Sequence, residues 1–178
     1  NYCDIISMSY LFLSCTEEIF IRAFILKIQY QRIKIMTLLK THIEFRSDNF
    51  PQTAEEKEEW DGQIWGHTLA KFLSEELPKH GVNVLDFVNE DWGYLIPLAD
   101  EKFKDIWIGC NHYQEYEDGF LVFTNPSKPI VKKGFFKKID ISEQLIFLAT
   151  ILNEILITNP TIYAQHWWDE KEMKLIGE

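Results

Sequence analysis

The chain has 178 residues, with 18 Lys and Arg against 28 Asp and Glu, so its formal net charge is −10. Hydrophobic residues make up 46% and aromatic residues 15% of the chain, which excludes intrinsic disorder. The negative charge argues against non-specific binding to nucleic acid or to an anionic membrane surface, because both need positive charge. The length fits one domain with a sizeable core.

The first 35 residues stand apart from the rest of the chain. It begins with Asn1, whereas Met36 is followed by residues typical of the start of a first strand. We therefore predict that residues 1–35 are a spurious or non-native extension. The alternatives are a real helix that begins at Thr16 and a targeting segment, although no apolar run here reaches the roughly 18 residues of a membrane span.

Leaving out this segment changes the charge and the cysteine count. The remainder has 14 basic and 25 acidic residues, a net charge of −11, and its one cysteine is Cys110. A single cysteine forms no intramolecular disulfide, which favours a reducing compartment and predicts a cytoplasmic protein. From 36 to 168 we expect a single domain, followed by a polar tail at 169–178.

A strand and a helix are predicted first. His42–Ser47 alternates apolar and polar residues, as a half-buried strand does. Thr53 and Glu56 form a capping-box pattern for a helix start, which Gly62 is expected to interrupt or delay. An apolar stripe at helical spacing then runs to Pro78, and it consists of Trp65, Leu69, Phe72, Leu73 and Leu77.

A run of strands with short polar turns follows. The predicted strands are Val82–Val88, Trp92–Leu98, Phe103–Cys110 and Phe120–Phe123. Asp118-Gly119 is a hairpin signal before the last of them. Strands joined by short turns favour antiparallel pairing.

The C-terminal third contains a lysine-rich stretch, a helix and a strand. Ser127–Lys138 holds five lysines, and we interpret it as a solvated loop, with a patch that binds phosphate or an acidic surface as the alternative. Asp140 and Glu143 open a helix with an apolar stripe, and Thr161–Trp167 is a last strand. The order of elements predicts a two-layer α+β sandwich, in which two amphipathic helices cover a mostly antiparallel sheet.

No catalytic or cofactor motif stands out. Cys110 and His112, with Asp118, are the best nucleophile candidates, but residues two apart on a strand have Cβ atoms roughly 7 Å apart. A cysteine in an apolar strand is also commonly structural. The five histidines are scattered without the spacing of a metal site. We expect no metal, no cofactor and no catalysis, and keep a small enzyme with a Cys110/His112 or histidine–carboxylate site as the alternative.

Aromatic residues beside acidic turns predict a binding surface, because Trp and Tyr supply much of the binding energy of protein interfaces. The predicted surface consists of Asp91, Trp92, Tyr113, Glu115, Tyr116, Asp118 and Trp168. We expect a basic protein partner, such as a toxin or effector that an immunity or inhibitor protein covers. Nucleic acid and membrane are not expected as partners.

Three segments carry a resemblance to other proteins. NEDWGYLIPL (89–98), IWIGCNHYQEYEDGFLVFTNPSKP (106–129) and FFKKID (135–140) resemble a group of small, acidic bacterial proteins with E-D-W-G-[WY] and W-I-G-C motifs. Asn111 stands where the group has Gly, and Tyr94 where Trp is usual. The resemblance covers about Met36 to Trp168; it implies a bacterial, cytoplasmic origin and no activity.

Overall fold

The computed structural model describes residues 22, 39–113, 115–133 and 137–176. The chain divides into two units, residues 1–34 and 35–178, and all the described strands belong to the second unit. Apart from Arg22, the predicted N-terminal extension lies outside the described residues. No helix in the described part of the chain is long and apolar enough to cross a membrane.

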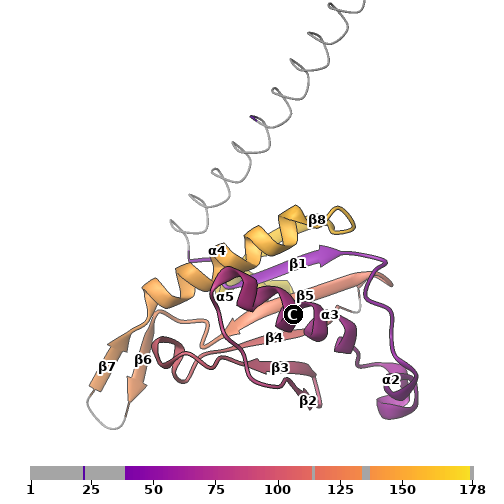
Figure 1. Cartoon of the computed structure of the whole chain (residues 1–178), viewed down its shortest axis with the longest axis horizontal. Helices are drawn as coiled ribbons and strands as arrows, with labels where there is room; N and C mark the ends of the chain where they lie inside the picture. The colour runs from indigo at the N-terminus through magenta and orange to yellow at the C-terminus, as the bar shows by residue number, and fades with distance from the viewer. Residues whose placement is uncertain (1–21, 23–38, 114, 134–136, 177–178) are drawn as a thin grey trace, which may run out of the picture. The chain divides into compact units, whose positions relative to one another are not determined.

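A six-stranded antiparallel sheet forms the centre of the second unit (Figure 1). Its spatial order is β2 (Val88–Glu90), β3 (Gly93–Pro97), β4 (Trp107–His112), β5 (Gly119–Asn125), β1 (His42–Arg46) and β8 (Tyr163–Trp168). A separate hairpin consists of β6 (Ile130–Lys133) and β7 (Lys137–Asp140). The sheet therefore has two edge strands, β2 and β8.

One face of the sheet builds the core. Ile43 of β1 pairs with Val122 of β5, and Val122 pairs with Cys110 of β4, so these side chains form one buried row across the sheet. In β1 and β5 the neighbours of Ile43 and Val122 point to the opposite face and are half-buried. This alternation is the pattern that the sequence of β1 predicts.

Two helices cover the buried face. They are α3 (His67–Glu76) and α4 (Ser142–Thr158), and the apolar stripe of each joins the same core as the inward strand residues. The predicted two-layer α+β sandwich with a mostly antiparallel sheet is confirmed. There are two shorter helices among the described residues: α2 (Ala54–Glu58) precedes α3 in the sequence, and α5 (Glu170–Ile176) follows α4. The segment predicted as a polar tail thus contains a helix.

Three predicted elements differ from the structure. The strand predicted at Val82–Val88 forms one bridge, from Val84 to Leu98, and its last residue begins β2; between them Asn83 is bound through its backbone and side chain to Asp100. The strand predicted from Phe103 begins at Trp107, after a 3-10 turn that buries Phe103. The lysine-rich stretch is the β6–β7 hairpin, because Val131 and Ile139 pair across it and pack against the core.

Candidate functional site

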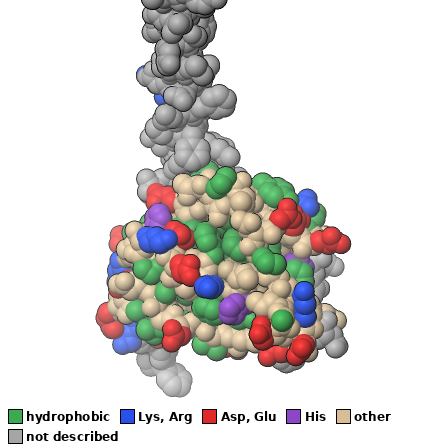
Figure 2. Space-filling view, turned by 45° about the vertical axis from the view of Figure 1, so that its right-hand side comes forward, with side chains coloured by type: hydrophobic (Ala, Val, Ile, Leu, Met, Phe, Trp, Pro, Cys, Tyr) green, Lys and Arg blue, Asp and Glu red, His purple; other side chains and the backbone are tan. Residues whose placement is uncertain are grey.

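The two ends of the sheet differ in charge. At the end where β1 stops, the chain turns through segments 47–66, 89–92 and 113–118, which together hold eleven acidic residues and one basic residue, Lys57. We call these three segments the acidic end; α2 and the β2–β3 turn mark it on the right of Figure 1. In Figure 2, which turns this side forward, acidic side chains lie among apolar ones.

The opposite end carries most of the lysines. Segments 39–41, 98–106, 126–141 and 169–176 hold ten basic and seven acidic residues. The β6–β7 hairpin belongs to this lysine-rich end. The net charge of the chain is therefore concentrated at one end of the sheet, which the linear sequence does not show because the acidic segments are far apart in it.

Six of the seven predicted surface residues lie in the acidic end, and each of them is exposed or half-buried. Asp91, Glu115 and Tyr116 are exposed, and Tyr113 is half-buried. The pKa of Tyr113 is raised by burial and by the nearby carboxylate of Glu115. Phenol rings and carboxylates thus lie together here.

Asp118 is held inside a network at the same end. Its carboxylate accepts a 2.7 Å hydrogen bond from Nε of Arg46 and another from the Tyr163 hydroxyl, and both lower its pKa. Arg46 also lies over the ring of Tyr116, 4.8 Å from its centroid. Arg46 thus contacts both Tyr116 and Asp118, and the Asp118 carboxylate is engaged within the fold.

Trp92 and Trp168 lie on the second face of the sheet. The Trp92 ring is 5.6 Å from Trp107 and 5.4 Å from Phe123 between centroids, and the Phe123 ring lies against Gly109. Trp168 is the last residue of β8 and pairs with His42, at the lysine-rich end. The structure therefore separates Trp168 from the other six predicted residues.

Glu56 is a buried carboxylate whose second role the sequence does not predict. Its Oε2 accepts from the Thr53 N–H at 2.7 Å, as the capping box predicts. Its Oε1 accepts from Gly66 N–H and His67 N–H, both at 2.8 Å, at the start of α3. Burial alone would raise its pKa, but these N–H donors and the Tyr94 hydroxyl outweigh burial and lower it. Glu56 therefore joins α2 to the first turn of α3.

Cys110 and His112 do not form a nucleophile–base pair. The Cys110 thiol is fully buried, and burial raises its pKa. The His112 ring stacks on Trp65 at 3.6 Å, its Nε2 lies 3.0 Å from the Tyr116 carbonyl oxygen, and burial lowers its pKa. A thiol with a raised pKa is a poor nucleophile.

Cys110 is therefore expected to be inert in the folded protein. In a Cys3→Ser, Cys15→Ser background, a thiol-directed alkylator should leave native protein unmodified and add one group per chain in denaturant. Mass spectrometry measures both. Rapid modification of the native protein would contradict this and return the enzyme alternative to consideration.

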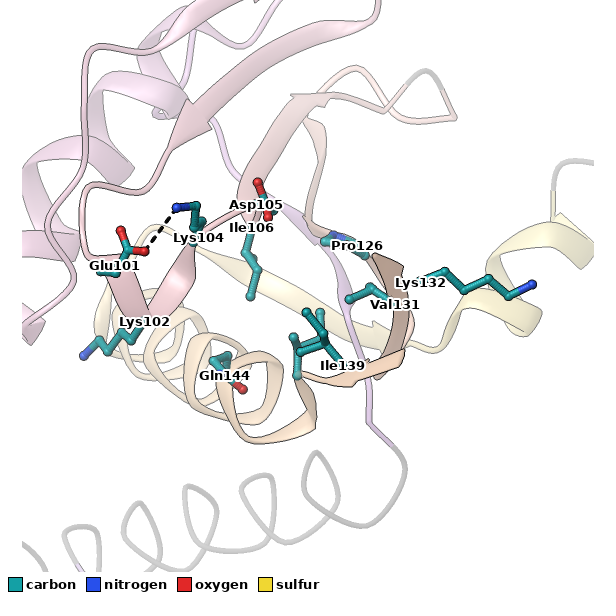
Figure 3. Close-up of a pocket in the computed structure, with 11 residues that line it drawn as sticks. Glu101, Lys102, Lys104, Asp105, Ile106, Pro126, Val131, Lys132, Ile139 and Gln144 are labelled. Atoms are coloured by element: carbon teal, nitrogen blue, oxygen red, sulfur yellow. Dashed lines mark hydrogen bonds and ion pairs between the residues drawn. The ribbon is translucent and has the colours of Figure 1, made fainter. Parts of the chain in front are cut away.

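A cavity of 410 Å³ lies at the lysine-rich end, at the base of the β6–β7 hairpin (Figure 3). Its walls are mainly apolar: Ile106, Pro126, Val131, Ile139 and Ile141. At its rim Lys104 pairs with Glu101 at 3.2 Å, and the Lys132 side chain points away from it. None of the seven predicted residues lines this cavity.

The described residues contain no group of three His, Cys, Asp or Glu side chains placed to hold a metal ion. Comparison of the chain with protein-family models, with curated proteins and with solved structures gave no match.

Proposed function

We propose that this chain is a cytoplasmic, non-enzymatic interaction protein that binds a basic protein through its acidic end, in the manner of an immunity or inhibitor protein. The observation that carries the proposal is the gathering of eleven acidic residues in three segments at one end of the sheet. Glu56 is buried and Asp118 pairs with Arg46, so nine of these acids remain against one lysine, Lys57. Such a charge distribution attracts an oppositely charged protein and speeds its association.

The aromatic side chains of the acidic end supply the second part of the argument. Tyr116 is 40% exposed, and Arg46 and the Asp118 network hold it in place. A pre-ordered aromatic side chain loses little conformational entropy on binding, so more of its contact energy contributes to affinity. Charge would thus govern the rate of encounter, and Tyr113 and Tyr116 would contribute to the lifetime of the complex.

Charge reversal at the acidic end tests the proposal. Asp91 and Glu117 are exposed in two different turns of this end, so Asp91→Lys with Glu117→Lys should remove capture of a basic protein from a lysate of the native host. The matched control is Glu75→Lys with Glu143→Lys, two exposed acids on α3 and α4 with the same change in net charge.

The captured protein is then identified by mass spectrometry and its association rate is measured with purified components. We expect this rate to fall by about tenfold or more from low to high salt, and to fall in the acidic-end variant but not in the control. Equal loss in both variants, or a partner that is not basic, would contradict the proposal.

A further inference from the structure

The two edges of the sheet are protected to different degrees. Strand edges present unpaired N–H and C=O groups, and proteins limit unwanted pairing with short strands, charges, prolines or bulges. β2 has three residues and ends in Glu90, next to Asp91. β8 has six residues, Tyr163–Trp168, and contains no Asp, Glu, Lys, Arg or Pro. Among the described strands, none pairs with its outer edge.

A bulge protects only the first part of β8. The pairing with β1 shifts between Glu44 and Arg46, where Ala164 has a φ of 52°. From His166 to Trp168 the strand pairs regularly with β1, opposite Glu44, Ile43 and His42. Tyr163 is 44% exposed, and Ala164 and His166 are exposed as well. The regular part, His166–Trp168, carries no charged side chain, and His166 in it is exposed, so this part of the outer edge can accept another strand.

We propose that two copies of the chain pair antiparallel through the outer edges of their β8 strands and form one continuous twelve-stranded sheet. A second copy fits this edge better than a basic partner does, because an uncharged strand offers no attraction to a basic segment. In a two-fold pairing centred on His166, Gln165 lies opposite Trp167 of the other copy, and inward side chains stay on the inward face.

The charges at the two ends of the sheet favour the same arrangement. β8 begins at the acidic end and finishes at the lysine-rich end, where Trp168 pairs with His42. In an antiparallel pair, the acidic end of each copy therefore lies on the same side as the lysine-rich end of the other. Two molecules with a net charge of −10 each thus avoid placing their acidic ends together.

Sedimentation of the full chain tests the pairing. The wild type should form a dimer with a concentration-dependent equilibrium. His166→Lys should shift it to monomer, because the two-fold axis places like charges opposite each other. His166→Thr, which keeps a neutral strand, and Asn89→Lys, which places the same charge on β2, should both leave the dimer intact. Thermal unfolding of each variant separates loss of pairing from loss of fold.

Cross-linking gives an independent readout. In a Cys3→Ser, Cys15→Ser background, His166→Cys should form an intermolecular disulfide under mild oxidation, whereas Asn89→Cys should not; Cys110 is fully buried and does not compete. A wild-type chain that stays monomeric at all accessible concentrations overturns the proposal. So does a dimer that His166→Lys leaves unchanged.

Discussion

Replacing Glu56 with Ala is expected to lower the free energy of unfolding by about 3 kcal/mol, because it leaves backbone donors at the starts of two helices without their acceptor. Glu56 is 3% exposed and accepts from the N–H groups of Thr53, Gly66 and His67. Gly66 has no side chain that caps α3, so no other group replaces the carboxylate there. Urea unfolding followed by circular dichroism measures the loss.

The matched control is Glu58→Ala, an exposed carboxylate at the end of the same helix α2. It should change stability by less than about 0.5 kcal/mol. Glu56→Gln should fall between the two, because its amide oxygen still accepts from the start of α3 while its NH₂ group faces the Thr53 N–H. Equal stability of Glu56→Ala and wild type would contradict the capping role.

The same carboxylate gives stability a pH dependence with a definite sign. Hydrogen bonds hold the pKa of Glu56 in the fold below its usual value of 4.5. The ionised form therefore stabilises the fold above the unfolded-state pKa, and this contribution is lost as the pH falls through the lower pKa of the folded state. The stability difference between wild type and Glu56→Ala should thus be constant near neutral pH and shrink below about pH 4.

The sequence predicts the strands and helices that have a clear period. β1 and α4 match their predictions, because in each the apolar residues recur at the spacing of the buried face. The sequence does not predict the β6–β7 hairpin, because its many lysines are typical of a solvated loop. Among its described residues, only Val131 and Ile139 pack against the core. Phe103 resembled a strand residue, yet Asp105, with a φ of 66°, ends the turn that buries it.

The candidate site was predictable only in its composition. The acidic turns and their tyrosines are visible in the sequence, but their meeting at one end of the sheet depends on strand order. Asp118 resembles a solvated turn residue until β1 and β8 bring Arg46 and Tyr163 to it. Trp168 resembles a member of the same surface, although the direction of β8 places it at the other end. Long-range pairing, which no local pattern encodes, decides these cases.

Gly93→Ala is expected to destabilise the fold by about 3–5 kcal/mol, because β3 approaches β4 too closely there for a side chain. A Cβ at this position would lie 2.6 Å from the Cys110 carbonyl oxygen and 2.6 Å from the Asn111 Cβ. The backbone φ of 145° is also one that L-residues rarely adopt. Neither contact is the end of a flexible side chain, so relief requires β3 and β4 to move apart.

Gly81→Ala separates the contribution of the backbone conformation from that of the contact. Gly81 has a φ of 78°, and a Cβ there would meet no heavy atom within 4 Å, so its cost should be only about 1–2 kcal/mol. Thermal and urea unfolding of both variants gives the comparison. If Gly93→Ala lowered the free energy of unfolding no more than Gly81→Ala does, the close approach of β3 and β4 would not contribute to the cost of the substitution. The expected excess measures how closely β3 approaches β4 at Gly93, next to the turn whose Trp92 ring packs on Trp107 and Phe123.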